Sequence, residues 1–133
     1  MENQKFNPVG WFEIYVQDIV KAEKFYAEVL QVQFESMADP TGAPDGDMKM
    51  SAFPMTMEEI PGASGALVQM KGAPSGGNST VIYFTSQDCS VEESRVEKAG
   101  GKVHESKMSI GDYGFVSLCF DVDGNMFGIH SMK

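Results

Sequence analysis

The chain has 133 residues and a formal net charge of −9, from 10 basic and 19 acidic side chains. The length predicts one domain of residues 1–133, and 42% hydrophobic residues are enough for a packed core. The sequence has no basic run for a phosphate backbone and no apolar window near the roughly 20 residues of a spanning helix, which excludes nucleic-acid and membrane partners.

The first half of the chain predicts a strand, a helix and three strands. Residues 9–16 form the first predicted strand, with bulky side chains on both faces. Asp18 then stands at the N-cap position of a helix, where its carboxylate can accept a free amide of the first turn. The apolar stripe of this helix is Ile19, Ala22, Tyr26, Val29 and Leu30. Further strands are predicted at 31–37, 48–53 and 65–70, separated by loops at 38–47 and 54–63.

The second half repeats this order after a connection rich in glycine at 71–79. A strand at 81–84 leads to Asp88, and Ser90 with Glu93 then forms a predicted capping box for the second helix. The helix ends at the glycine pair 100–101, because glycine adopts the left-handed conformation at little cost. Three strands are predicted at 102–107, 113–120 and 126–132, with a tight turn at 123–125.

The repeat, with a period of about 70 residues, indicates an internal duplication. We predict an α+β fold of two tandem βαβββ modules, at about 7–71 and 79–133. Each module is too small for a good core of its own, so the two should pack together. The helices should cover the outer face of the sheets and leave the other face concave.

Three stretches of the sequence carry a resemblance to a known family. They are residues 16–30, 97–103 and 121–125. On these residues the chain resembles the vicinal oxygen chelate superfamily, the glyoxalase, bleomycin-resistance and extradiol-dioxygenase group. The resemblance covers nearly the whole chain and implies mixed sheets that curl around a shared cleft. Enzymes of the family usually hold one divalent metal there, bound by His, Gln and Glu side chains.

The residues at the family's metal positions depart from that pattern. The resemblance places these positions at Trp11, near Gln69, near Val81 and at Gly128. Trp, Val and Gly have no side chain that binds a metal, whereas a catalytic metal requires about three protein ligands. We therefore predict a cleft with no metal and no cofactor. A displaced metal site made of Glu13, Gln69 and His130 is the alternative.

Strand parity predicts which side chains face the cleft, because residues two apart share one face of a strand. Glu13 lies in an otherwise apolar strand, where burial is costly, so it is either a cleft residue or half of an ion pair, and we favour the cleft. His130 either contacts a ligand or forms only local hydrogen bonds. The aromatic residues either line a pocket or pack in a core or interface. The predicted ligand-binding residues are Trp11, Glu13, Tyr15, Gln69, Tyr83, Met126 and His130.

The sequence therefore predicts a small-molecule-binding protein with the fold of this family, and a homodimer, as is common among its members. One alternative is a divalent-metal-dependent lyase, isomerase or dioxygenase. Another is a drug-sequestering resistance protein, for which the negative charge favours a cationic drug. Cys89 and Cys119 form neither a CxxC motif nor a disulfide framework, which predicts a cytoplasmic location.

Overall fold

The computed structural model describes residues 9, 11–37, 47–55, 62–77 and 80–133. The loops predicted at 38–47 and 54–63, and the connection at 71–79, each lie partly outside the described residues. Within the described part of the chain, neither helix has the length and apolar character needed to cross a membrane.

The first four strands form one mixed sheet. They are β1 (Trp11–Tyr15), β2 (Glu35–Met37), β3 (Met48–Ala52) and β4 (Ser64–Met70). Their order in the sheet is β1-β4-β3-β2, with β1 parallel to β4 and the other pairs antiparallel. β2 begins later than predicted, because Val32 and Phe34 pack against the core before the chain reaches the sheet.

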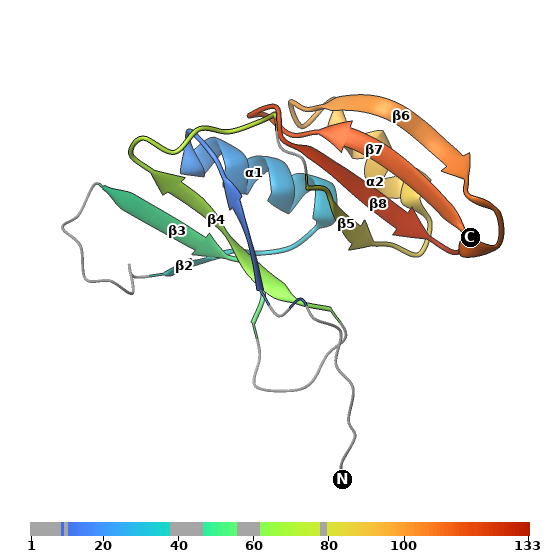
Figure 1. Cartoon of the computed structure of the whole chain (residues 1–133), viewed down its shortest axis with the longest axis horizontal. Coiled ribbons are helices and arrows are strands. Elements are labelled where there is room, and N and C mark those ends of the chain that lie inside the picture. Colours follow the sequence, from blue (N-terminus) through green and yellow to red (C-terminus); the bar gives the residue numbers. More distant parts are fainter. Residues whose placement is uncertain (1–8, 10, 38–46, 56–61, 78–79) are drawn as a thin grey trace, which may run out of the picture.

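The last four strands form a second sheet with the same order. They are β5 (Ile82–Thr85), β6 (Lys102–Ser109), β7 (Phe115–Phe120) and β8 (Met126–Ser131), arranged β5-β8-β7-β6. Residues Gly111–Tyr113, predicted in part as the start of a strand, form a short 3-10 helix, η1. The two sheets lie side by side along the long axis and do not close into a barrel (Figure 1). The identical strand orders confirm the predicted duplication of the βαβββ unit.

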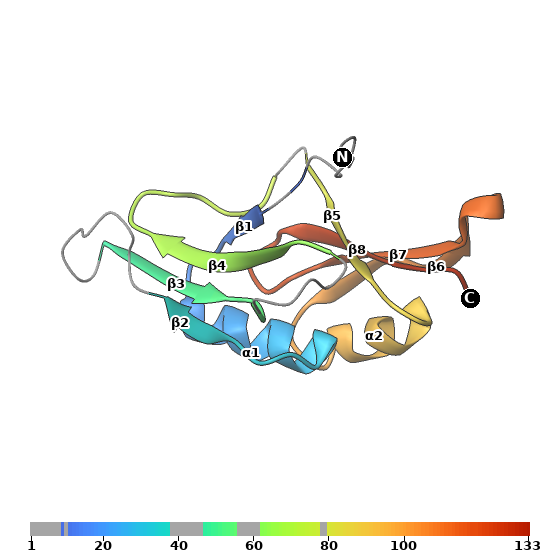
Figure 2. The ribbon, with the colours of Figure 1, turned by 90° about the horizontal axis from the view of Figure 1, so that it is seen from below.

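Both helices cover the same side of the two sheets (Figure 2). They are α1 (Ile19–Leu30) and α2 (Cys89–Val96). Asp18 caps α1 as predicted, because its Oδ1 accepts from the amides of Val20 at 3.1 Å and Lys21 at 3.3 Å. The Arg95 side chain on α2 donates to the carbonyl of Val29 on α1 at 2.8 Å, which ties the two helices together.

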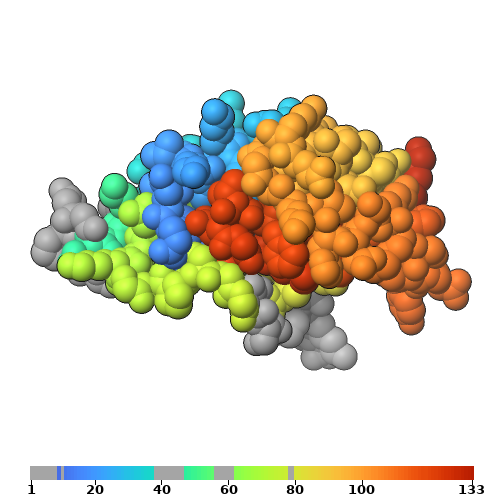
Figure 3. Space-filling view, turned by 90° about the horizontal axis from the view of Figure 1, so that it is seen from above, coloured from blue at the N-terminus to red at the C-terminus, as the bar shows by residue number. Residues whose placement is uncertain are grey.

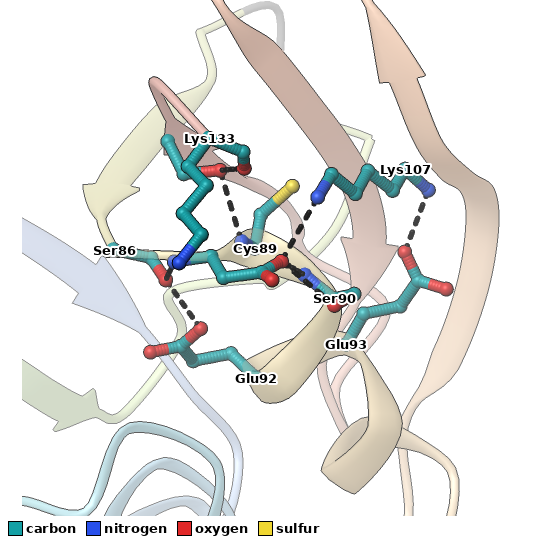
Figure 4. Close-up of polar contacts among 9 residues, drawn as sticks. Ser86, Cys89, Ser90, Glu92, Glu93, Lys107 and Lys133 are labelled. Carbon is teal, nitrogen blue, oxygen red and sulfur yellow. Dashed lines mark hydrogen bonds and ion pairs between the residues drawn. The ribbon is translucent and has the colours of Figure 1, made fainter.

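The capping box predicted for α2 is wrong. Asp88 is the N-cap, and its Oδ1 accepts from the Ser90 amide at 3.0 Å and the Ser90 hydroxyl at 2.7 Å. Glu93 instead accepts from the backbone amide of Lys107 on β6 at 2.7 Å (Figure 4). The pairing of β6 with β7 shifts register between Glu105 and Met108, and Lys107 has no Cα partner in that ladder. Glu93 satisfies this amide, so a tertiary contact takes the place of the local one.

The charge of Asp88 makes the cap of α2 dependent on pH. The Ser90 hydroxyl and then Lys107, 3.0 Å away, lower the pKa of Asp88 from 3.8 to about 2. A carboxylate with a lowered pKa stabilises the fold fully above its ordinary pKa, and the stabilisation is lost as the pH falls through the folded-state pKa. We expect Asp88→Asn to lower the melting temperature at neutral pH and to flatten its fall between pH 4 and pH 2, measured by circular dichroism. Asp112→Asn is the control. A dependence of melting temperature on pH in Asp88→Asn that runs parallel to that of the wild type would contradict this role.

The main core lies between the helices and both sheets. Rings from the two halves meet there: the centroids of Tyr26 and Phe127 are 5.7 Å apart, and those of Phe53 and Phe84 are 5.9 Å apart. Such aromatic pairs add to the free energy gained from burial alone. The space-filling view shows the blue start of the first module packed against a red segment of the second module (Figure 3). The modules thus share one core, as the size argument predicted.

A buried carboxylate also joins the modules. Asp121 is 4% exposed. Its Oδ2 accepts from the hydroxyl of Tyr26 on α1 at 2.7 Å and from the side-chain amide of Asn125 at 3.0 Å. Its Oδ1 accepts from the backbone amides of Asp123 at 2.8 Å and Asn125 at 2.9 Å. Burial, and then the nearby Asp121 charge, raise the pKa of Tyr26 well above its ordinary value, so the hydroxyl keeps the proton that it donates. The turn predicted at 123–125 is confirmed, with Gly124 at a φ of 82°.

Candidate functional site

The face of the second sheet opposite the helices carries a hollow. Neighbouring strands align Tyr83 with Gly128, Thr85 with His130, and His130 with Val116, so these side chains share one face. The hollow has a volume of about 510 Å³ and is lined by Tyr83, Thr85, Met108, Ile110, Val116 and His130. This volume falls within the range of pockets that hold drug-sized ligands.

The ring of Tyr83 covers the backbone of Gly128 within this hollow. A Cβ atom at residue 128 would lie 2.3 Å from Cδ2 and 2.4 Å from Cε2 of the Tyr83 ring, so only glycine leaves room for the ring. Tyr83 remains 49% exposed although it packs against the sheet. The arrangement leaves an aromatic surface open to solvent at one end of the hollow. This ring occupies the space next to the strand position that the family resemblance assigns to a metal-binding side chain.

His130 is oriented by the connection between β6 and β7. Its Nε2 lies 2.7 Å from the carbonyl oxygen of Tyr113 in η1. A carbonyl oxygen only accepts, so Nε2 carries the hydrogen and donates it. Nδ1 has no protein partner among the described residues. The neutral ring can therefore still accept one hydrogen bond, through Nδ1, from a bound molecule.

A second, smaller hollow lies between the two modules. It has a volume of about 220 Å³, and Glu13, Tyr15, Asn125 and Met126 are among the residues that line it. Glu13 accepts a hydrogen bond on each carboxylate oxygen, from the Tyr15 hydroxyl at 2.9 Å and from Trp11 Nε1 at 3.2 Å. The hydrogen bond to Glu13, and then burial, raise the pKa of Tyr15. Tyr15 therefore stays protonated at neutral pH and donates a hydrogen bond to Glu13.

Gln69 is engaged on the opposite face of the first sheet. Its Oε1 accepts from the backbone amide of Ile19 at 2.8 Å and so helps to cap α1. Glu13 is aligned with Ala66 on β4, whereas Gln69 shares a face with Leu67, which is buried in the core beneath the helix. The structure brings together Trp11, Glu13 and Tyr15, but it places Gln69 on the other side of the sheet from them.

These placements bear on the metal that the family resemblance implies. The three side chains of the alternative metal site have different hydrogen-bond partners. Glu13 accepts from Trp11 and Tyr15. Gln69 accepts from the Ile19 amide, and His130 donates to the Tyr113 carbonyl. Within the ranges that the structure describes, no group of three or more His, Cys, Asp or Glu side chains is placed to hold an ion. The donor set of the described residues does not fit a divalent metal.

Five of the seven predicted residues line one of the two hollows, and Trp11 and Gln69 line neither. Tyr83 and His130 line the larger one, and Glu13, Tyr15 and Met126 line the smaller one. Sequence reasoning missed the other residues of the larger hollow: Thr85, Met108, Ile110 and Val116. The parity rule that selected Tyr83 also reaches Thr85, two residues further along β5. Met108 and Ile110 were missed because the strand predicted to end at 107 continues as β6 to Ser109.

The family model of the Glyoxalase/Bleomycin resistance protein/Dioxygenase superfamily matches residues 8–129. The chain belongs to this superfamily. Two sheets with the same strand order and two helices on one face agree with the α+β fold of its members. No curated protein matches the chain.

Solved structures of the superfamily share the fold. Glyoxalase I from Zea mays is 18% identical, with a TM-score of 0.71 over 91% of this chain and 43% of the maize chain. A glyoxalase/bleomycin resistance protein/dioxygenase domain from a Frankia species is 15% identical, with a TM-score of 0.69 over 97% and 100% of the two chains. An antibiotic-binding protein from a Streptomyces species is 22% identical, with a TM-score of 0.61 over 97% and 98%. At these identities the likeness shows the fold alone.

Proposed function

We propose that this protein binds a small molecule in the hollow of its second sheet, without the divalent metal that many superfamily members use. The observation that carries the proposal is the ring of Tyr83, which lies over Gly128 and remains half exposed inside a hollow of about 510 Å³. An exposed aromatic ring in a concave site offers a stacking surface for a planar group.

The lining of the hollow indicates the chemistry of its ligand. Met108, Ile110 and Val116 give apolar walls, and methionine adapts its shape to different ligands. The Thr85 hydroxyl and His130 Nδ1 are the polar groups that can orient a bound molecule. The net charge of −9 favours neutral or cationic ligands over anions. The superfamily structure described as an antibiotic-binding protein supports a binding role, of which drug sequestration is one form.

Binding of the neutral planar dye Nile red tests this proposal, with dye fluorescence as the measurement. We expect saturable binding to the wild type and about tenfold weaker binding to Tyr83→Ala, because stacking and apolar contact with the ring are lost. Tyr113→Ala is the matched control, since that tyrosine is 77% exposed and its side chain is not part of the hollow. Equal affinities of the two variants would overturn the site.

Elemental analysis separates the proposal from the metal-dependent alternative. Protein prepared without chelator or affinity tag should contain divalent metal at far below one ion per chain. Near-stoichiometric metal would overturn the metal-free part of the proposal and favour a lyase, isomerase or dioxygenase of the glyoxalase type.

A homodimer and a cytoplasmic location belong to the same proposal. Apolar side chains outside both hollows are also 45–71% exposed in the isolated chain, which supports a contact surface between copies: Val20, Val91 and Met132. Cys89 and Cys119 are free and buried, as expected for a protein of a reducing compartment.

A further inference from the structure

Glu13 is a carboxylate whose hydrogen-bond partners among the described residues are two aromatic side chains. Trp11 Nε1 and the Tyr15 hydroxyl each donate to one of its oxygens, at 3.2 Å and 2.9 Å. In the described part of the chain it has no Lys, Arg or His partner. The negative charge is therefore held in a defined position by two neutral donors, and no cation among the described residues neutralises it.

The hydrogen-bonding capacity left at this place is that of an acceptor. A carboxylate has about four lone-pair positions, and the two aromatic donors occupy two of them. Because both donors already point at Glu13, neither is available to an anionic ligand. The remaining lone pairs suit a group that only donates. An ammonium group is such a group, with donors and no acceptor.

The aromatic rings add a second attraction for the same kind of group. A cation near the face of Trp or Tyr is attracted by the ring quadrupole, and Trp is the strongest of the aromatic side chains in this respect. Trp11 is 39% exposed, so a ligand can reach its ring from solvent. Charge, acceptor capacity and aromatic surface at Glu13 therefore all favour an organic cation.

The size of the adjoining hollow indicates how much of a ligand is held there. About 220 Å³ lies below the roughly 300–1,000 Å³ of pockets that enclose a whole drug-sized molecule. It is large enough for one functional group with its nearest substituents. Ile82 and Met126 on β5 and β8, the strands that carry Tyr83 and Gly128, line its other side.

We propose that Glu13, held between Trp11 and Tyr15, is a recognition site for the organic ammonium group of a small molecule. The proposal deepens the proposed function and rests on it in one respect, namely that the natural ligand is a small molecule. It adds the chemical class of that ligand, a compound with a protonated amine and an apolar or aromatic body. It also places this ligand contact at the smaller hollow between the modules, separate from the Tyr83 ring of the larger hollow.

Intrinsic fluorescence can test the site, because Trp11 is the only tryptophan in the chain and is itself part of the site. Three probes of similar shape are titrated: 2-phenylethylammonium, 2-phenylethanol and 3-phenylpropionate. We expect the ammonium to bind about tenfold more tightly than the alcohol, as the sum of an exposed ion pair and a cation–π contact. The propionate should give no saturable change. The preference for the ammonium should decrease as salt is added, because exposed charges are screened.

Glu13→Gln keeps the shape of the side chain and removes its charge. We expect it to weaken ammonium binding about tenfold, to the level of the alcohol, and to leave alcohol binding unchanged. Glu35→Gln is the matched control, because Glu35 is an exposed residue on the same face of the same sheet, three strands away on β2. An equal loss in the two variants would show that the total charge attracts the ammonium, which would overturn the site. Equal binding of ammonium and alcohol to the wild type would overturn it without any variant.

The two proposals fail in different ways. Nile red is neutral, so its binding tests the larger hollow independently of charge. We expect the affinity for the dye to fall in Tyr83→Ala and to stay unchanged in Glu13→Gln. An ammonium preference without any effect of Tyr83→Ala on the dye would overturn the proposed function and retain the ammonium site. The reverse result would retain the proposed function and overturn the ammonium site.

Discussion

Asp121→Ala lowers the free energy of unfolding by about 3 kcal/mol, because it removes the acceptor that a buried hydroxyl requires. Asp121 accepts from Tyr26, from the Asn125 amide and from two backbone amides of the turn after β7. Tyr26 is fully buried, so without Asp121 its hydroxyl cannot bond water instead. The loss should appear as a melting temperature about 10 °C lower in a thermal unfolding scan.

Two further variants separate this contact from a general effect of charge. Asp112→Ala makes the same change at an exposed position and should alter the free energy of unfolding by less than about 0.5 kcal/mol. Tyr26→Phe in the Asp121→Ala background removes the orphaned hydroxyl and should recover part of the lost stability. If Asp121→Ala behaves like Asp112→Ala, the carboxylate does not join the modules.

Gly128→Ala abolishes the aromatic surface of the larger hollow by adding one methyl group. The new Cβ would lie 2.3 Å from the Tyr83 ring, and the ring is half exposed, so it can move into solvent. We expect Nile red to bind about tenfold more weakly, as for Tyr83→Ala, because both changes remove the same stacking contact. The free energy of unfolding should change by less than about 1 kcal/mol. Movement of the ring relieves the clash, and alanine is more stable than glycine within a strand.

The double variant provides the control for this prediction. Once Tyr83 is already alanine, Gly128→Ala meets no ring, and it should change the affinity for Nile red less than about twofold. Such non-additivity is expected when two changes act through one contact. If the effects of the two substitutions multiply, Gly128 acts on the dye by a route other than Tyr83.

Local signals in the sequence were sufficient for the architecture. The alternation of apolar residues, the Asp18 cap and the glycine-rich connection predicted the order of elements and the duplication, and the structure has both. These signals work because a cap or a periodic pattern involves residues within a few positions of one another. Parity correctly placed Trp11, Glu13 and Tyr15 on one face of β1, since residues two apart share a face of a strand.

What only the tertiary structure decided depends on residues far apart in the chain. The Lys107 amide, left without a Cα partner by the shift in β6, attracts Glu93 away from the predicted capping box, and Asp88 caps α2 instead. The amide of Ile19 likewise engages Gln69, which the sequence had placed in the cleft. The packing of the two sheets around the shared core separates five of the predicted residues into two hollows, and leaves Trp11 and Gln69 outside both. Periodicity predicts which side chains share a face of one strand. The distances between side chains of different strands depend on how the two modules pack.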